Sequence, residues 1–446
     1  MNESKPITLE RILDRDVLLE AYKRVRANKG SSGIDGMKTE ELLDYIRNHP
    51  KEISESVRNG KYRPNPIMRV YIPKDNGEKR PLGIPTVKDR FVQQAIALVL
   101  SEEYEKVFSD NSFGFRPGRG CHDAINRALK YVNEGFEWVI DLDLSKFFDT
   151  VNHSKLLQLL SDKIEDGRVI SLIHRFLRAS ICENGKIGKK NTIGTPQGGV
   201  ISPVLANILL NELDQLLDSR GIRFVRYADD MVILCGSKKA AERILTNVTK
   251  FVEEKLFLKV NTEKTKILQA CEESQFLGFA FTKKVKARKK KECPTQRFFA
   301  VVHKKKRVKL AESLKTILDR RAKGGVEIVK RKLLLKIRGW SNYFKGAIQE
   351  RRKRDTDAWI RRRIRQLLWK QWKKPGKRLE EFNKRLNKPT SVSAYAFSSN
   401  RYWHMSKTKE IHRALGNSIL KTEKRRVDMD LCVRILIYDG VRVSLF

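Results

Sequence analysis

The residues best suited to chemistry in this chain are Tyr227-Ala228-Asp229-Asp230, which lie between two apolar runs. Two such runs joined by so short a polar link predict a tight β-hairpin with adjacent carboxylates at its tip. This pair is costly, because like charges repel each other and burial raises the pKa of a carboxyl group. A divalent cation removes that cost, so the segment predicts a metal site.

A second segment with carboxylates lies upstream, at residues 138–144 (Trp-Val-Ile-Asp-Leu-Asp-Leu). Because side chains alternate along a strand, Val139, Asp141 and Asp143 share one face, and the other four residues share the opposite face. Magnesium prefers oxygen ligands, usually one or two carboxylates with substrate phosphates. Two such ions, about 4 Å apart, stabilise both the attacking and the leaving oxygen of a phosphoryl transfer. An isolated Asp-Asp pair is more often a solvated turn, but the upstream strand favours catalysis.

Further motifs surround these carboxylates in a definite order along the chain. They are Ile72–Lys74 with Arg80–Thr86, Ser112–Pro117, Asp143–Asp149, Gly194–Pro203, Tyr227–Asp230, Leu258–Lys266, Phe276–Phe279 and, downstream, Ile337–Phe344. With these motifs the chain resembles a reverse transcriptase, and most closely the reverse transcriptase/maturase proteins encoded by bacterial group II introns. One motif can arise by chance, whereas so many in the right order are not expected to.

The resemblance implies an α+β right-hand polymerase, with fingers and palm of antiparallel sheet plus helices, a three-helix thumb bundle and a small basic C-terminal module. We expect the type without an endonuclease domain, because the cysteines and histidines are scattered and form no paired metal motif. The expected domains are 1–66 (N-terminal extension and fingertip region), 67–300 (fingers and palm), 301–384 (maturase or X domain, the thumb) and 385–446 (nucleic-acid-binding, D-like module).

Apolar spacing and turn residues predict the elements within these domains. The basic run Lys283–Lys291 is expected at the solvated tip of a sheet or hairpin over 276–302. We expect helices over 7–27, 88–108 and 122–134, a strand pair over 67–86 around the turn Lys74–Gly77, a helix within Gly194–Asn211 capped by Ser202 with Pro203 in its first turn, and three helices within 304–378.

By resemblance, the catalytic and metal-binding residues are Asp143, Asp229 and Asp230. Asp143 and Asp229 would bridge two Mg²⁺ ions, and Asp230 would support the hairpin end of the site. Asp141 lies on the same strand face as Asp143, and we assign it a supporting or structural role. Lys264 would neutralise charge on the departing pyrophosphate.

The resemblance also implies a set of nucleotide-binding residues. Lys74 and Arg80 would grip the triphosphate, a task that suits a cation and a bidentate guanidinium, although both could be solvent-facing hairpin charges. Gln197 would lie under the nascent base pair. Phe148 would crowd a ribose 2′-hydroxyl and so favour dNTPs, with core packing as the alternative. Arg116 would touch the template or the nucleotide, or serve the structure.

The positive charge of the chain is concentrated in its last third. The net charge is +40, and residues 282–446 hold 49 Lys and Arg against 14 Asp and Glu, whereas residues 1–281 hold 44 against 39. Such a surplus predicts a polyanionic partner and binding that weakens steeply with salt. We expect thumb contacts to RNA phosphates and 2′-hydroxyls from Arg338, Arg362, Arg363 and Lys370.

Composition also excludes several classes of protein. No apolar run reaches the ~18 residues of a membrane helix, and the polar N-terminus has no signal-peptide core. The six cysteines form no CxxC pair, which argues against a disulfide framework and a zinc site. We therefore expect a cytoplasmic protein without a membrane partner, present as a monomer.

The function predicted from the resemblance is an RNA-directed DNA polymerase of a group II intron. Its partners would be intron RNA, an RNA template–primer, dNTPs and, during retrohoming, a DNA target; it would also assist splicing as a maturase. Two alternatives stay open. One is an RNA-binding splicing cofactor with little polymerase activity, and the other is a stand-alone reverse transcriptase of a defence or diversity-generating system. The three aspartates favour an active polymerase.

Overall fold

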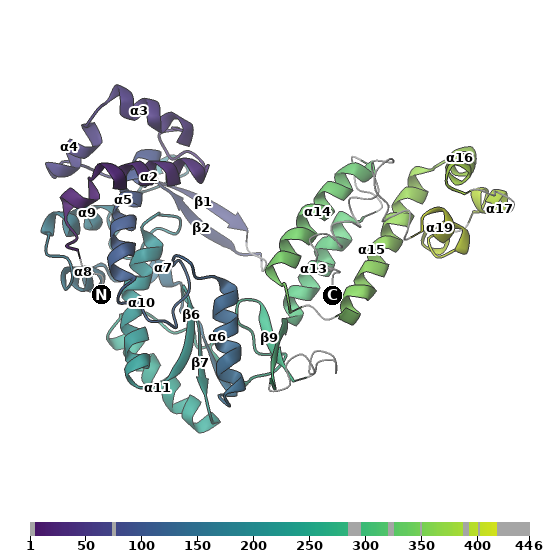
Figure 1. The fold of residues 1–446 in the computed structure, drawn as a ribbon. Coiled ribbons are helices and arrows are strands. Elements are labelled where there is room, and N and C mark those ends of the chain that lie inside the picture. The colour runs from purple at the N-terminus through teal and green to yellow at the C-terminus, as the bar shows by residue number, and fades with distance from the viewer. Residues whose placement is uncertain are drawn as a thin grey trace. The chain divides into compact units, whose positions relative to one another are not determined.

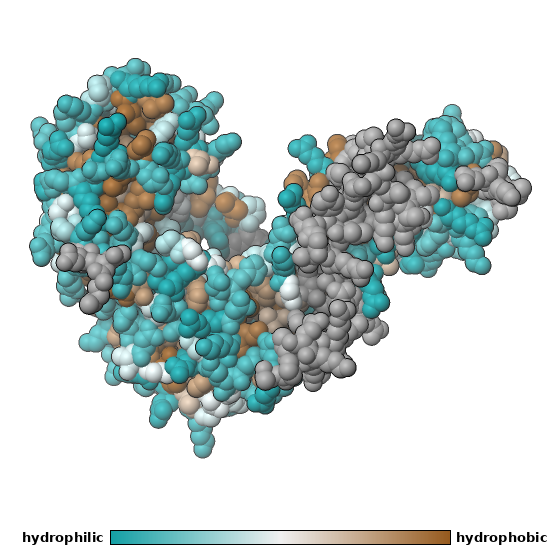
Figure 2. All heavy atoms as spheres, in the orientation of Figure 1, coloured by the Kyte–Doolittle hydropathy of each residue, from teal (hydrophilic) through white to brown (hydrophobic). Residues whose placement is uncertain are grey.

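The computed structural model describes residues 5–73, 77–283, 296–319, 325–347, 350–386, 392–399 and 402–416. The chain divides into two compact units (Figure 1). The first unit comprises Met1–Leu277 and Cys293–Phe298, and the second comprises Gly278–Glu292 and Phe299–Phe446. Each unit has its own apolar core. On the face shown in Figure 2, apolar residues surface only in small groups among hydrophilic ones.

The first unit begins with short helices rather than with the single helix predicted over 7–27. Helix α1 (Leu9–Ile12) ends, and α2 (Arg15–Ala27) begins after Asp14, whose carboxylate accepts a hydrogen bond from the backbone N–H of Asp16. A short polar side chain at this position starts a new helix, which periodicity alone does not reveal. The next elements are η1 (Thr39–Glu41), α3 (Leu42–Asn48) and α4 (Glu52–Arg58).

A four-stranded sheet follows, with strand order β2-β1-β4-β5. The predicted strand pair is confirmed as the antiparallel strands β1 (Ile67–Pro73) and β2 (Lys79–Ile84), in which Arg80 lies opposite Ile72. Residues 74–76 of the predicted turn, including Lys74, lie outside the described residues. The sheet is completed by β4 (Ile181–Glu183), parallel to β1, and β5 (Lys186–Ile187).

A second, fully antiparallel sheet has the order β6-β7-β3-β8. Its register places Leu142 opposite Met231, so the next residues, Asp143 and Asp230, meet at the same end of the sheet. Ile140 and Leu142, which alternation places on one face, belong to the apolar core, and Val139 of the other face is buried too. The strands are β3 (Trp138–Leu142), β6 (Arg223–Tyr227), β7 (Asp230–Cys235) and β8 (Lys266–Gln269).

Of the remaining helices of the first unit, α6 (Cys121–Asn133), α10 (Ser202–Ser219) and α11 (Lys238–Glu254) pack against this sheet (Figure 1). The helix predicted after residue 201 is α10, but Ser202 does not cap it: its hydroxyl donates to the carbonyl of Pro196, at 2.9 Å, and ties down the preceding loop. The others are α5 (Val87–Tyr104), α7 (Phe147–Thr150), α8 (His153–Ser161) and α9 (Gly167–Leu177).

The second unit begins with the antiparallel pair β9 (Phe279–Thr282) and β10 (Phe299–Val302), which confirms the hairpin predicted over 276–302. The basic run Lys283–Lys291 lies outside the described residues except for Lys283. Three helices follow, as predicted: α13 (Lys304–Ile317), α14 (Gly325–Tyr343) and α15 (Glu350–Gln371).

The described part of the C-terminal module shares the core of these three helices. Met405 and Ile411 are fully buried in one cluster with Leu333 and Trp369, and Arg365 donates to the carbonyl of Leu415 at 2.9 Å. Residues 417–446 lie outside the description. No helix among the described residues is both long and apolar enough to cross a bilayer. The remaining helices are α16 (Pro375–Arg385), α17 (Val392–Ala396), α18 (Tyr402–Met405) and α19 (Lys409–Ala414).

Candidate active site

The β6–β7 hairpin presents the two adjacent aspartates at its turn. Tyr227 pairs with Asp230, which leaves Ala228 and Asp229 as the two turn residues. Ala228 has a φ of 59°, in the left-handed region that a side chain with a Cβ seldom adopts. The predicted tight hairpin is therefore confirmed, and its turn holds a backbone conformation that needs support.

Asp143 and Asp229 influence each other electrostatically. Burial raises the pKa of the Asp229 carboxyl group above its ordinary value, and the nearby charge of Asp143 raises it further, whereas the cations of Arg80 and Arg226 lower it. Asp229 is half-buried, while Asp230 is exposed. The tertiary structure thus joins residues 86 positions apart into one acidic site.

The Leu258–Lys266 segment holds the main chain of Asp143. The N–H of Asp143 donates to the hydroxyl of Thr265 at 3.2 Å, and its carbonyl accepts from the N–H of Asn261 at 2.8 Å. Lys264 places its Nζ 3.5 Å from Oδ2 of Asp143. This lysine is 69% exposed, so the ion pair itself adds little stability. Asp141 lies two residues back, opposite Val232 and Lys266.

The glycine-containing loop at residues 194–201, before α10, packs against strand β2. The N–H of Gly83 donates to the carbonyl of Gln197 at 2.6 Å. Gly198 has a φ of 109°, and a Cβ there would lie 2.4 Å from the carbonyl oxygen of Gly83, so no other residue fits. The loop therefore holds the half-buried Gln197 against β2, the strand that also carries the exposed Arg80.

The two phenylalanines after Asp143 take different environments. Phe147 is buried in the core, whereas Phe148 is half-buried, and the two rings meet edge to face with centroids 5.1 Å apart. The carbonyl of Phe148 accepts from the N–H of Thr195 at 2.7 Å, which ties it to the loop that carries Gln197. Phe148 packs against the edge of the apolar core, and its ribose-gate role stays a prediction.

Arg116 is committed to the structure. Its Nε and Nη2 bind the carboxylate of Glu105, and its Nη1 donates to the carbonyls of Ser109 and Ser112 at 2.5 and 2.8 Å. Only 2% of its side chain is exposed. Its donors are already used inside the protein, which favours the structural alternative, and the contact of Arg116 with template or nucleotide stays a prediction.

A buried polar network behind the hairpin is the feature that motif analysis missed. Arg226 is 1% exposed and binds Asp214 through Nε and Nη2, at 2.8 and 2.5 Å. Its Nη1 donates to Oδ1 of Asn207 at 2.8 Å and to the carbonyl of Ala228 at 3.0 Å. The amide of Asn207 in turn donates to the carbonyl of Gly114 at 2.8 Å. The turn is therefore linked to α10 through fully buried side chains.

A sequence signal for this network exists in retrospect. Arg226 interrupts an apolar strand, and Asp214 lies between Leu210 and Leu217 on the buried face of an apolar helix. A charge on an apolar face is costly unless a partner neutralises it, so two such residues of opposite sign predict a pair.

The carboxylates suit a divalent cation that substrate oxygens help to ligate. Among the described residues, no three His, Cys, Asp or Glu side chains form a cluster able to hold a metal by themselves, so Asp143, Asp229 and Asp230 do not make a complete cage. Asp143 and Asp229 nevertheless form a partly buried like-charge pair that a cation would neutralise. This donor set fits Mg²⁺, which usually binds through one or two carboxylates and phosphate oxygens.

Comparisons with known proteins agree with this geometry. Residues 72–281 match the reverse transcriptase (RNA-dependent DNA polymerase) model, and residues 307–386 match the group II intron maturase-specific domain. Protein YkfC of Escherichia coli (strain K12) is 33% identical over 316 residues, which span 62% of this chain and 83% of YkfC. The chain belongs to the group II intron reverse transcriptase/maturase family.

A longer relative shows the same relationship. Group II intron-encoded protein LtrA of Lactococcus lactis subsp. cremoris is 31% identical over 333 residues, which span 60% of this chain and 55% of LtrA. The chain thus matches about half the length of that relative. The predicted family and the α+β right-hand polymerase fold are confirmed.

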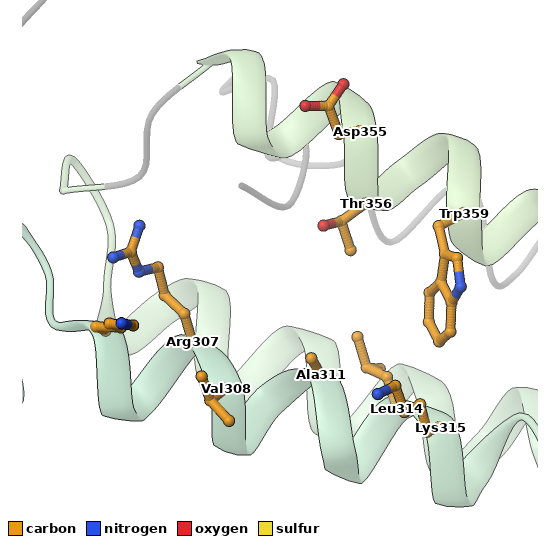
Figure 3. Close-up of a pocket in the computed structure, with 9 residues that line it drawn as sticks. Arg307, Val308, Ala311, Leu314, Lys315, Asp355, Thr356 and Trp359 are labelled. Carbon is orange, nitrogen blue, oxygen red and sulfur yellow. The ribbon is translucent and has the colours of Figure 1, made fainter.

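The maturase-specific domain contains a groove between α13 and α15 (Figure 3). Its volume is about 490 Å³, and Trp359 points from α15 towards α13. Apolar side chains line its centre, and cations outnumber the single carboxylate around it. The lining residues are Lys304, Arg307, Val308, Ala311, Leu314, Lys315, Asp355, Thr356 and Trp359.

The four predicted RNA-binding residues of the maturase domain differ in their surroundings. Arg338 is exposed on α14, and Lys370 is partly buried. Arg362 lies over the ring of Trp403, with 5.1 Å to its centroid. Arg363 donates to the carbonyl of Leu318 at 3.0 Å and to Gln366 at 2.9 Å, so part of its hydrogen-bonding capacity serves the bundle. Arg338 is therefore the residue best placed for a phosphate.

Proposed function

We propose that this reverse transcriptase copies RNA into cDNA from dNTPs, and that it binds group II intron RNA to assist splicing and, with a DNA target, retrohoming. The observation that carries the proposal is the acidic site formed by Asp143 and Asp229 beside the charge of Arg80. The maturase-specific domain and the positive charge of residues 282–446 support the intron RNA as partner.

Each residue of the site has a chemical task in this proposal. Bound Mg²⁺ would stabilise charge on the attacking 3′-oxygen and on the leaving pyrophosphate. Asp143 and Asp229 hold the metal, Arg80 binds the triphosphate, and Lys264 accepts charge near the pyrophosphate. Asp230 supports the hairpin end of the site, and Lys74 remains a proposed triphosphate contact.

Primer extension on an RNA template with dNTPs and Mg²⁺ tests the proposal directly. We expect extension of a primer with a free 3′-hydroxyl and none of a primer ending in a 2′,3′-dideoxynucleotide. Tight RNA binding without extension would contradict the polymerase and leave a splicing cofactor. Extension with no preference for RNA of group II introns would favour a stand-alone reverse transcriptase.

Phe148→Ala is expected to admit ribonucleotides. Removing the ring opens space beside the ribose, and a steric discrimination of this kind is worth about 1–3 kcal/mol, or roughly 10- to 200-fold. The measurement is the ratio of kcat/KM for a dNTP and the matching rNTP. Phe397→Ala, which removes a 66% exposed ring in the second unit, is the control and should leave the ratio unchanged. An unchanged ratio in Phe148→Ala would assign that ring to packing.

RNA binding is expected to weaken by a factor of about 10³–10⁵ between roughly 50 and 200 mM salt, if about 6–10 phosphates are contacted. Arg338→Ala should lower the slope of log K against log salt by about one, because one phosphate contact is lost. Lys238→Ala, on α11 of the first unit and 62% exposed, is the control. Equal slopes for all three proteins would exclude Arg338 as a phosphate contact.

A further inference from the structure

The catalytic hairpin does not stabilise its own turn. Neither turn residue is a glycine, and Ala228 is left-handed, which is unfavourable for a residue with a Cβ. Asp229 is also held partly buried beside Asp143, although like charges repel each other. A strained backbone persists only where the surrounding structure holds it, and such strain concentrates at functional sites.

Arg226 supplies that support from within the same hairpin. One of its guanidinium nitrogens, Nη1, donates to the carbonyl of Ala228 at 3.0 Å, and this carbonyl belongs to the peptide that leads into Asp229. The other two nitrogens bind Asp214 on α10. A planar guanidinium can divide its donors between two partners in this way, whereas a lysine ammonium has no such fork.

The main chain of Arg226 is also held, by hydrogen bonds to the segment that contains Asn111 and Phe113. Its N–H donates to the carbonyl of Asn111, and its carbonyl accepts from the N–H of Phe113, both at 2.9 Å. Gly114 then lies so close to the turn that a Cβ would be 2.2 Å from the nitrogen of Ala228. Asn207 links Arg226 to Gly114, since its Oδ1 accepts from Arg226 and its amide nitrogen donates to the carbonyl of Gly114.

A buried ion pair is by itself weak evidence for a role in stability, because desolvation offsets much of its attraction. The Arg226–Asp214 pair differs because one of the guanidinium donors that it leaves over reaches the catalytic turn. This donor, on Nη1, binds the carbonyl of Ala228. The position of that carbonyl sets the orientation of the peptide bond between Ala228 and Asp229. The pair therefore couples the rigid helix α10 to the carboxylate of the proposed metal site.

We propose that Arg226 is a positioning residue for polymerisation: anchored on Asp214, it holds the Ala228 carbonyl and thereby keeps Asp229 facing Asp143. The proposal rests on the proposed reverse transcriptase function. Arg226 is 1% exposed and its side chain binds only groups inside the protein, so its loss should change the chemical step and the response to Mg²⁺ more than nucleotide binding.

The test compares full-length Arg226→Lys and Asp214→Asn with wild type in primer extension, with kcat corrected for the folded fraction. We expect kcat to fall by about 10²-fold, because a displacement of about 1 Å at a reacting group has that effect. The KM for dNTP should stay within about twofold, and half-maximal activity should need more Mg²⁺. Asn207→Ala leaves the ion pair in place and should produce a smaller fall of the same kind, which covers the case that the other variants fail to fold.

Arg11→Lys is the matched control. Arg11 forms an ion pair of 2.8 Å with Glu103, whose side chain is fully buried, in the N-terminal part of the first unit. This variant should lose thermal stability without a change in kcat or in Mg²⁺ dependence. If the Arg226, Asp214 and Asn207 variants behave like Arg11→Lys, the positioning role is wrong. If wild type itself does not extend a primer, the proposed function fails instead, so the two failures are distinguishable.

Discussion

Asp229→Asn is expected to reduce primer extension by about three orders of magnitude or more, while RNA binding stays as in wild type. The substitution keeps the shape of the side chain and removes its charge, so Asp143 would lose the carboxylate that bridges the metal with it. Single-turnover extension on an RNA template measures the chemical step, and filter binding of the same template–primer measures affinity. The folded fraction should not fall, because burial next to Asp143 makes the charged form of Asp229 costly.

Two further variants show whether the loss is specific to the acidic site. Asp143→Asn should show the same loss, since both carboxylates belong to one site. Asp44→Asn, on α3 with 75% of its side chain exposed, should extend primers like wild type. Substantial extension by Asp229→Asn would move the metal site away from the hairpin and contradict the assignment.

Gly114→Ala is expected to slow the polymerase and to destabilise the first unit. The added Cβ would lie 2.2 Å from the nitrogen of Ala228, a distance that real Cβ atoms do not show, so the catalytic turn must shift. Overpacking of this kind costs about 1–3 kcal/mol, and a displacement of about 1 Å in the turn reduces the rate about 10²-fold. Thermal unfolding and kcat for primer extension measure the two effects.

The control for this prediction is Gly167→Ala, at the start of α9, where an added Cβ would meet nothing within 4 Å. It should leave kcat unchanged and should not destabilise the protein, because alanine is the better helix former. If Gly114→Ala matches this control, the close approach between Gly114 and the turn does not exist in solution.

Local patterns alone determined the site's main components. The hairpin with Asp229 at its turn follows from two apolar runs and a short polar link, and the core face of β3 follows from alternation. The order of the motifs identified the family, and the excess charge of residues 282–446 pointed to a polyanionic partner. The sequence predicts these features correctly because they depend on residues close together in the chain or on composition.

The tertiary structure decided the features that depend on distant partners. It assigned Arg116 to Glu105 and to two backbone carbonyls, although the aromatic-glycine setting of this arginine also suited a nucleotide contact. It split the first predicted helix at Asp14, and it merged the described part of the C-terminal module with the thumb core. In each case hydrogen bonds or a shared apolar surface decided the outcome, and the local pattern of residues did not contain them.

The network around Arg226 shows most clearly what local sequence patterns cannot predict. Its partners Asp214, Asn207 and Asn111 lie 12, 19 and 115 positions away, and no spacing rule relates them. A strand and a helix each carry one charge on an apolar face, and only their packing brings the two together. The sequence alone therefore determined which residues can do the chemistry, and the tertiary structure decided what holds them in place, because that depends on contacts between segments far apart in the chain.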